Sequence, residues 1–203
     1  MLIFLSGILR AQAPTFFSAT SLNSDTPGLL QLQTNWLTRQ DYFSSDLNNQ
    51  PPGEYLLQAF DTPTGLPNSA YVLTGASVDL WMSQPTGATG ALFPEVKLFL
   101  NGPAGTPVCT MTSNTALVAS MNASLSLGCS ASAPVPVTPS DRYYLWVGFT
   151  STATPAVSTQ VEMAVGNVFR GSPRTDLGLS LAAIPNIGGI TPGAGPVGTL
   201  VKI

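Results

Sequence analysis

Short stretches in which apolar and polar residues alternate run through most of the chain. Clear examples are the runs EVKLFL, RYYLWVGF and STQVEMAV. Turn-forming sequences such as Asn101-Gly102 separate them, and no stretch keeps the period of an amphipathic helix. The pattern predicts an all-β fold, an antiparallel β-sandwich of jelly-roll type over residues 14–170 with about eight to ten strands.

The same alternation assigns side chains to the two faces of each strand. In RYYLWVGF, Tyr143, Leu145, Val147 and Phe149 share the face expected in the core. The opposite faces mix aromatic and charged residues, which suits a sugar because rings stack on its C–H face and polar groups bind its hydroxyls. Packing beneath a loop, with charges paired across strands, is the alternative. The candidate ligand-binding residues are Asp79, Trp81, Glu95, Lys97, Arg142, Tyr144 and Trp146.

Charge is sparse and dispersed. Charged residues make up 8% of the chain, against roughly 25% in an average soluble domain. The seven Lys and Arg residues form no cluster, and the net charge is −3. Nucleic acid is therefore not an expected partner, and neither is an anionic membrane surface.

Residues 1–13 resemble the end of a secretory signal peptide. An apolar run, 2–9, precedes Ala11-Gln12-Ala13, which has the small-x-small form of a cleavage site. The run is too short to span a bilayer. A first β-strand is the alternative, because no positive charge precedes the run and Pro14 would follow the cleavage site. The protein is expected to be extracytoplasmic, secreted or at the cell surface.

Cys109 and Cys129 are the two cysteines of the sequence. In an exported protein they predict one disulfide, which would stabilise the fold by about 3 kcal/mol by closing a loop of about twenty residues. Two buried free thiols are the alternative. A zinc site is not expected, since two cysteines without histidine make a poor ligand set, and no cofactor or other metal is predicted.

The sequence contains no histidine, which excludes nucleophile–histidine catalysis and histidine-based metal sites within these residues. No glycine-rich phosphate motif occurs. Glycoside hydrolysis needs only two carboxylates, but the glutamates Glu54, Glu95 and Glu162 have no spacing that singles out a pair. The chain is therefore not predicted to be an enzyme.

After the last alternating run, prolines and glycines without alternation predict a linker at residues 171–186. The final residues, PNIGGITPGAGPVGTLVKI, then resemble the opening of an IPT/TIG domain, an immunoglobulin-like sandwich found in bacterial surface proteins. The motif Pro-x-x-Gly-Pro-x-Gly-Thr begins here at Pro192 and ends at Thr199, before a Val/Ile-rich strand. The resemblance implies that residues 187–203 are an incomplete IPT/TIG domain.

The sandwich segment also resembles an N-terminal domain of exported bacterial proteins that carry IPT/TIG domains or YD-type (RHS-like) repeats. The runs GEYLLQAFDT, VDLWM, FPEVKLFL and DRYYLWVGF carry this resemblance, which brings no catalytic residue with it. These features predict a non-catalytic structural or adhesion module of a larger secreted or cell-surface protein. A carbohydrate-binding module using the aromatic face and a jelly-roll glycosidase are the alternatives. The expected partners are a glycan or another surface polymer and the downstream domains of the same chain.

Overall fold

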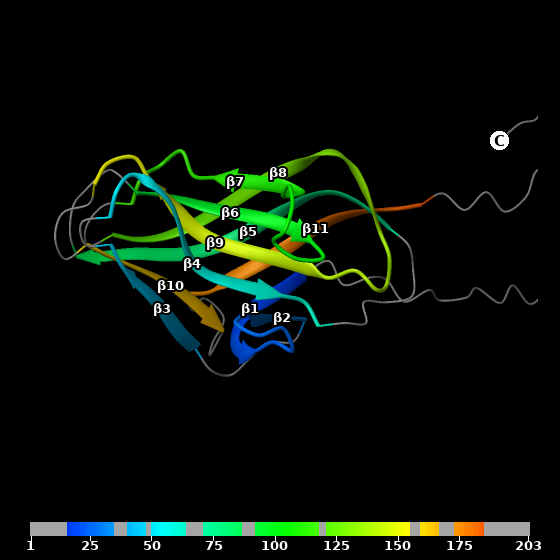
Figure 1. Cartoon of the computed structure of the whole chain (residues 1–203), viewed down its shortest axis with the longest axis horizontal. Coiled ribbons are helices and arrows are strands. Elements are labelled where there is room, and N and C mark those ends of the chain that lie inside the picture. Colours follow the sequence, from blue (N-terminus) through cyan, green and yellow to red (C-terminus); the bar gives the residue numbers. More distant parts are fainter. Residues whose placement is uncertain are drawn as a thin grey trace, which may run out of the picture.

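The computed structural model describes residues 16–34, 40–47, 50–63, 71–86, 92–117, 121–154, 159–166 and 173–184. These ranges are all-β (Figure 1). The predicted signal-peptide end, 1–13, and the predicted IPT/TIG opening, 187–203, lie outside the described residues. The strands are β1 (Phe16–Asn23), β2 (Leu30–Gln33), β3 (Gln40–Asp46), β4 (Gly53–Asp61), β5 (Tyr71–Thr86), β6 (Leu92–Leu100), β7 (Cys109–Thr112), β8 (Met121–Val137), β9 (Tyr143–Ser151), β10 (Gln160–Gly166) and β11 (Thr175–Ala183).

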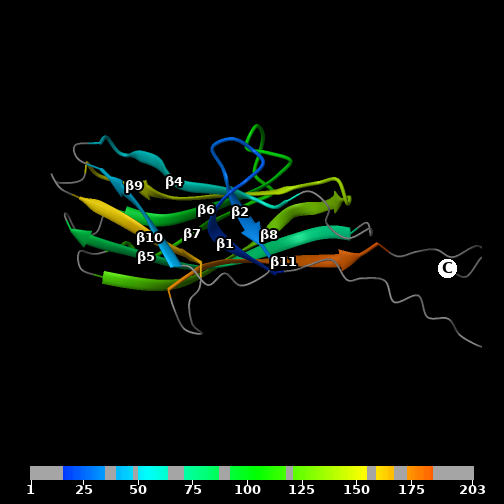
Figure 2. The ribbon, with the colours of Figure 1, turned by 90° about the horizontal axis from the view of Figure 1, so that it is seen from below.

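The strands are arranged in two packed layers, which Figure 2 shows edge-on. One layer is centred on β5, which pairs with β8 along one edge and with β11 and then β10 along the other. The second layer has the order β4-β9-β6-β7. Strands β1 and β2 join the layers, since β1 pairs with β11, and β2 pairs with both β1 and β4. All pairings are antiparallel except β2–β4, which confirms the predicted antiparallel β-sandwich.

The core lies between the layers, where the inward faces of both sheets meet. Tyr143, Leu145, Val147 and Phe149 of β9 are all at most 2% exposed, as their alternation predicts. Val78 of β5 faces them from the other layer and is fully buried. The period-two pattern therefore located the core correctly, because each strand buries one face and leaves the other outside.

The predicted linker at residues 171–186 is wrong, because it contains strand β11. This strand lies between β5 and β1, and its Leu177 and Leu179 are 0% and 6% exposed. A Cβ at Gly178 would lie 2.8 Å from Ser77 Oγ, so a larger residue there would require the Ser77 hydroxyl to move. The leucines alternate, but the flanking prolines and glycines hide the pattern. The sandwich therefore extends beyond residue 170, at least to Ala183.

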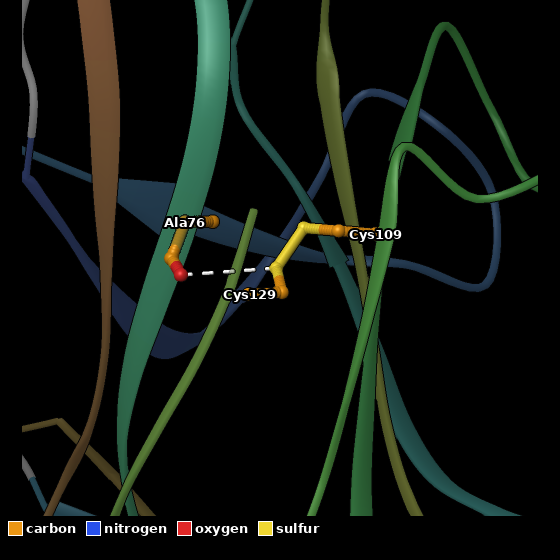
Figure 3. Close-up of a disulfide and its surroundings, with 3 residues drawn as sticks. All are labelled: Ala76, Cys109 and Cys129. Carbon is orange, nitrogen blue, oxygen red and sulfur yellow. Dashed lines mark hydrogen bonds between the residues drawn. A yellow bond between two sulfur atoms is a disulfide. The ribbon is translucent and has the colours of Figure 1, made fainter. Parts of the chain in front are cut away.

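The predicted disulfide is confirmed and closes the side of the sandwich away from β1 and β2. Cys109 on β7 and Cys129 on β8 are bonded (Figure 3), and Cys129 Sγ lies 3.7 Å from the carbonyl oxygen of Ala76 on β5. Because β7 and β8 belong to different layers, the bond joins the two sheets covalently. Across the described ranges, no helix is long and apolar enough to cross a membrane.

Candidate functional site

The seven candidate residues do not share one face of the molecule. Asp79 and Trp81 lie on the outer face of the layer centred on β5, where Asp79 is directly opposite Asp176 of β11. The other five lie on the outer face of the β4-β9-β6-β7 layer, where Lys97 is opposite Trp146. The alternation along each strand shows correctly that these side chains point away from the core. It does not show to which of the two layers each strand belongs.

Two of the outward aromatic residues on the second layer are themselves buried. Tyr144 and Phe99 are 6% and 7% exposed, and their rings meet edge to face with centroids 5.7 Å apart. Leu29, from the turn between β1 and β2, packs against them. These rings are therefore covered by a loop, which is the packing alternative, and they offer no open surface on which a sugar could stack.

Lys97 forms a compact charge cluster with two glutamates beside Trp146. Its Nζ lies 2.5 Å from Glu54 Oε2, 3.4 Å from Glu95 Oε1 and 5.0 Å from the centroid of the Trp146 ring. Glu95 is buried and accepts a hydrogen bond from the Thr150 hydroxyl. Partial burial lowers the pKa of Lys97, but the glutamates outweigh this effect and raise it. The ammonium therefore stays charged and binds both carboxylates.

On the opposite face, Trp81 packs against a residue that the sequence reasoning missed. The ring of Tyr42 on β3 meets Trp81 edge to face at 5.7 Å, and Tyr42 is 52% exposed. Its position in the run QDYFSSD was the available signal, since Tyr42 and Phe43 must point to opposite faces. Aromatic side chains therefore occur on both outer faces, with Tyr42 the most exposed of those described.

Asp176 is a buried carboxylate in the segment that the sequence predicted to be a linker. It is 1% exposed, accepts a hydrogen bond from Ser18 Oγ at 2.6 Å, and forms an ion pair with Arg174. Burial raises the pKa of Asp176, with a further contribution from Asp79, and the bonds to Ser18 and Arg174 oppose this rise only in part. This group binds β1 to β11.

Arg142 ties together three segments at one end of the second layer. Its Nε donates to the Thr62 carbonyl at 2.8 Å, and Nη1 donates to Thr26 Oγ1 at 2.9 Å. Nη1 also lies 3.4 Å from Asp61 Oδ2, and Nη2 forms an ion pair with Asp25. The hydrogen bond from Arg142 lowers the pKa of Asp25. The guanidinium thus holds the turn after β1 against the end of β4.

A hollow of about 210 Å³ opens beside this network. It lies between the turn after β1, the end of β4, the turn after β6 and the start of β9. Asp61 is 4% exposed and lines the hollow, and its Oδ1 accepts no hydrogen bond from any part of the chain that the structure describes. The walls include Thr26, Leu29, Asn101, Pro103, Ser140 and Tyr144.

No family model and no curated protein sequence matches the chain. Among solved structures, an α-amino acid ester hydrolase matches with a TM-score of 0.53 and 10% identity, over 83% of this chain and 36% of its own. A CocE/NonD family hydrolase from Staphylococcus aureus matches with a TM-score of 0.47 and 11% identity, over 82% and 36%. A structure of infectious bursal disease virus, Gx strain, matches with a TM-score of 0.25 and 12% identity, over 83% of this chain and 42% of its own. The chain thus spans about a third of the length of these hydrolases, and the first match shows a shared fold.

This comparison corrects the prediction of a non-catalytic surface adhesion module. The sandwich shares its fold with part of the α-amino acid ester hydrolase chain, an enzyme rather than an adhesion protein. The geometry does not favour a sugar site made of all seven residues or a glycosidase pair made of Glu54 and Glu95. The seven residues of the supposed sugar site lie on two faces, with Tyr144 buried. A glycosidase pair needs a protonated acid and room for substrate, whereas Lys97 occupies the space between Glu54 and Glu95.

Proposed function

We propose that this sandwich is the β-domain of a longer hydrolase, in which another part of the chain supplies the reacting groups. The observation that carries the proposal is the match to the α-amino acid ester hydrolase, where the similar region makes up 36% of the chain while covering 83% of this one. The sequence composition supports it. Without histidine, these residues cannot provide the general base of a nucleophile–histidine pair.

The proposal also assigns the hydrolase to an extracytoplasmic compartment. The Cys109–Cys129 disulfide is the supporting observation, because such bonds persist in oxidising environments and are rare in the cytosol. It joins β7 of one layer to β8 of the other, so it stabilises the sandwich where an oxidising compartment preserves it. The partner assigned to the sandwich is the catalytic part of the same chain, which it would contact through an interface of the size usual between domains.

The proposal is tested with the complete reading frame to which these residues belong, expressed in an oxidising compartment. Release of acid from alanine methyl ester and from p-nitrophenyl acetate is measured for the complete protein and for residues 1–203 alone. The complete protein is expected to hydrolyse at least one ester, and the 203-residue chain neither. Two results contradict the proposal: a complete protein that leaves both esters intact, or a 203-residue chain that is as active as the complete one.

A further inference from the structure

Three of the described strands pair with a single neighbour, which leaves each with a free edge. Strands β3, β7 and β8 pair with β10, β6 and β5, respectively. A free edge carries N–H and C=O groups that can pair with another chain, and proteins usually block it with charges, proline or a very short strand. Strand β7 has four residues, and β3 carries Asp41 and Asp46. These two edges are therefore protected in the ordinary way.

The free edge of β8 lacks this protection. The strand is 17 residues long and contains no charged residue. Its pairing with β5 is regular over the ten residues from Met121 to Ser130, and the register shift lies beyond them. Its prolines, Pro134 and Pro136, also lie beyond Ser130. We call residues 121–130 the open β8 segment, which is about 34 Å long at about 3.4 Å per residue.

Both faces of the open β8 segment suit the addition of another strand. On the core face, Leu125 and Leu127 pack against the hydrophobic core but are only partly buried. A strand added beside β8 would cover more of these leucines while it pairs with the free backbone groups, and both effects favour association. The outer face consists of small exposed residues that leave room for a neighbouring strand, Ser124, Ser126, Gly128 and Ser130.

A second copy of the chain is the partner that these features select. Because the segment carries no charge, it meets its own copy without repulsion, and a two-fold axis makes antiparallel pairing of identical strands self-complementary. Outer residues must face outer residues, since a slip of one residue would exchange the faces. Of the two longest registers that satisfy this condition, one places Ser126 opposite the partner's Ser126 and Leu125 opposite the partner's Leu127. This register brings both leucines of each copy into the contact.

The size of the contact sets the expected strength of association. A segment about 34 Å long and about 10 Å across, the spacing of packed sheets, would bury roughly 340 Å² on each copy and about 700 Å² in total. Stable interfaces bury about 1,200–2,000 Å². Since interfaces of about 1,600 Å² begin at micromolar affinity, this smaller contact should form a reversible dimer between about 10 μM and about 1 mM.

We propose that two copies of the chain associate through residues 121–130 of β8, paired as antiparallel strands about a two-fold axis. The two layers centred on β5 then become one continuous sheet across the dimer. The proposal does not depend on the hydrolase proposal, because the contact is formed by β8 alone.

The test is sedimentation equilibrium of the 203-residue protein, with its disulfide intact, over the concentration range of about 10 μM to about 1 mM given by the contact area. NMR spectra of the ¹⁵N-labelled protein are recorded over the same range. We expect a reversible monomer–dimer equilibrium and concentration-dependent shifts of the amides in residues 121–130. A monomer at every concentration, or a dimer whose shifts lie in other strands, would overturn the proposal.

Charged variants locate the interface. Ser124→Lys combined with Ser126→Lys brings four like charges together at the axis and should weaken dimerisation about fivefold or more. The same two positions changed to glutamate should weaken it similarly, and a mixture of the two variants should associate again. Ser44→Lys combined with Ser180→Lys adds the same charge at exposed positions of β3 and β11 and should dimerise like wild type. Dimerisation that the β8 lysines leave unchanged, that the control lysines weaken equally, or that the mixture does not restore would refute the β8 interface.

Discussion

Replacing Leu177 with alanine tests whether β11 is an integral part of the sandwich. Leu177 has no exposed surface and lies between Val78 of β5 and Phe17 of β1, which are 0% and 1% exposed. Buried Leu→Ala substitutions destabilise proteins by about 2–5 kcal/mol, most where the site cannot collapse. Because strands hold β11 on both edges, we expect about 3–5 kcal/mol here. At about 2–4 °C per kcal/mol for a chain of this size, the melting temperature should fall by roughly 6–20 °C.

The measurement is urea unfolding followed by tryptophan fluorescence, with thermal unfolding by circular dichroism alongside. Ser180→Ala is the matched control, because Ser180 is on the same strand but exposed, and it should change stability by less than about 0.5 kcal/mol. If Leu177→Ala is as stable as wild type within about 0.5 kcal/mol, then residues 173–183 do not pack as a strand. The prediction of a linker would then be correct after all.

Three further predictions follow from named contacts. Replacing Cys109 and Cys129 with serine removes a bond closing a separation of 20 residues and should lower the free energy of unfolding by about 3 kcal/mol; dithiothreitol should then have no further effect. Burial raises the pKa of Asp176 above 3.8, so the folded state holds its proton more tightly and loses stability as pH rises through that raised pKa. The free energy of unfolding of Asp176→Asn, measured with urea relative to wild type, should therefore be more favourable at pH 7 than at pH 4. If the difference between variant and wild type is the same at both pH values, this sign is wrong. Arg142→Lys removes the forked hydrogen-bonding geometry of the guanidinium and should destabilise the folded protein by roughly 1–3 kcal/mol. The backbone amide of Thr26 should then exchange hydrogen faster. Unchanged exchange would show that the guanidinium does not hold that turn.

The strand faces could be predicted from the sequence because burial of one face imposes a period of two. This explains why the core residues of β9 were identified correctly. The same reasoning missed β11, since Gly178 lies among its alternating leucines and prolines flank them. A local pattern with breakers on both sides is indistinguishable from a loop until its pairing partners, β5 and β1, are known.

The candidate site was less predictable because it depends on contacts between distant residues. Arg142 binds Thr26 and Asp25 across separations of 116 and 117 residues, and no local period encodes such a pairing. For the same reason, alternation placed Trp81 and Trp146 outside without showing that they lie on different layers. Asp61 follows an apolar run at the end of β4, and only the register opposite Tyr144 brings it to the hollow.

The central claim is that the sandwich belongs to a hydrolase whose reacting groups lie outside these 203 residues. The most direct measurement is to label the complete protein, isolated from its host with an antibody against the sandwich, with a fluorophosphonate probe that reacts with activated serine hydroxyls. Peptide mapping then locates the label. The account predicts one labelled serine, outside residues 1–203, whose labelling an ester substrate prevents. A label within these residues, or a complete protein that takes up none and cleaves no ester, would contradict it.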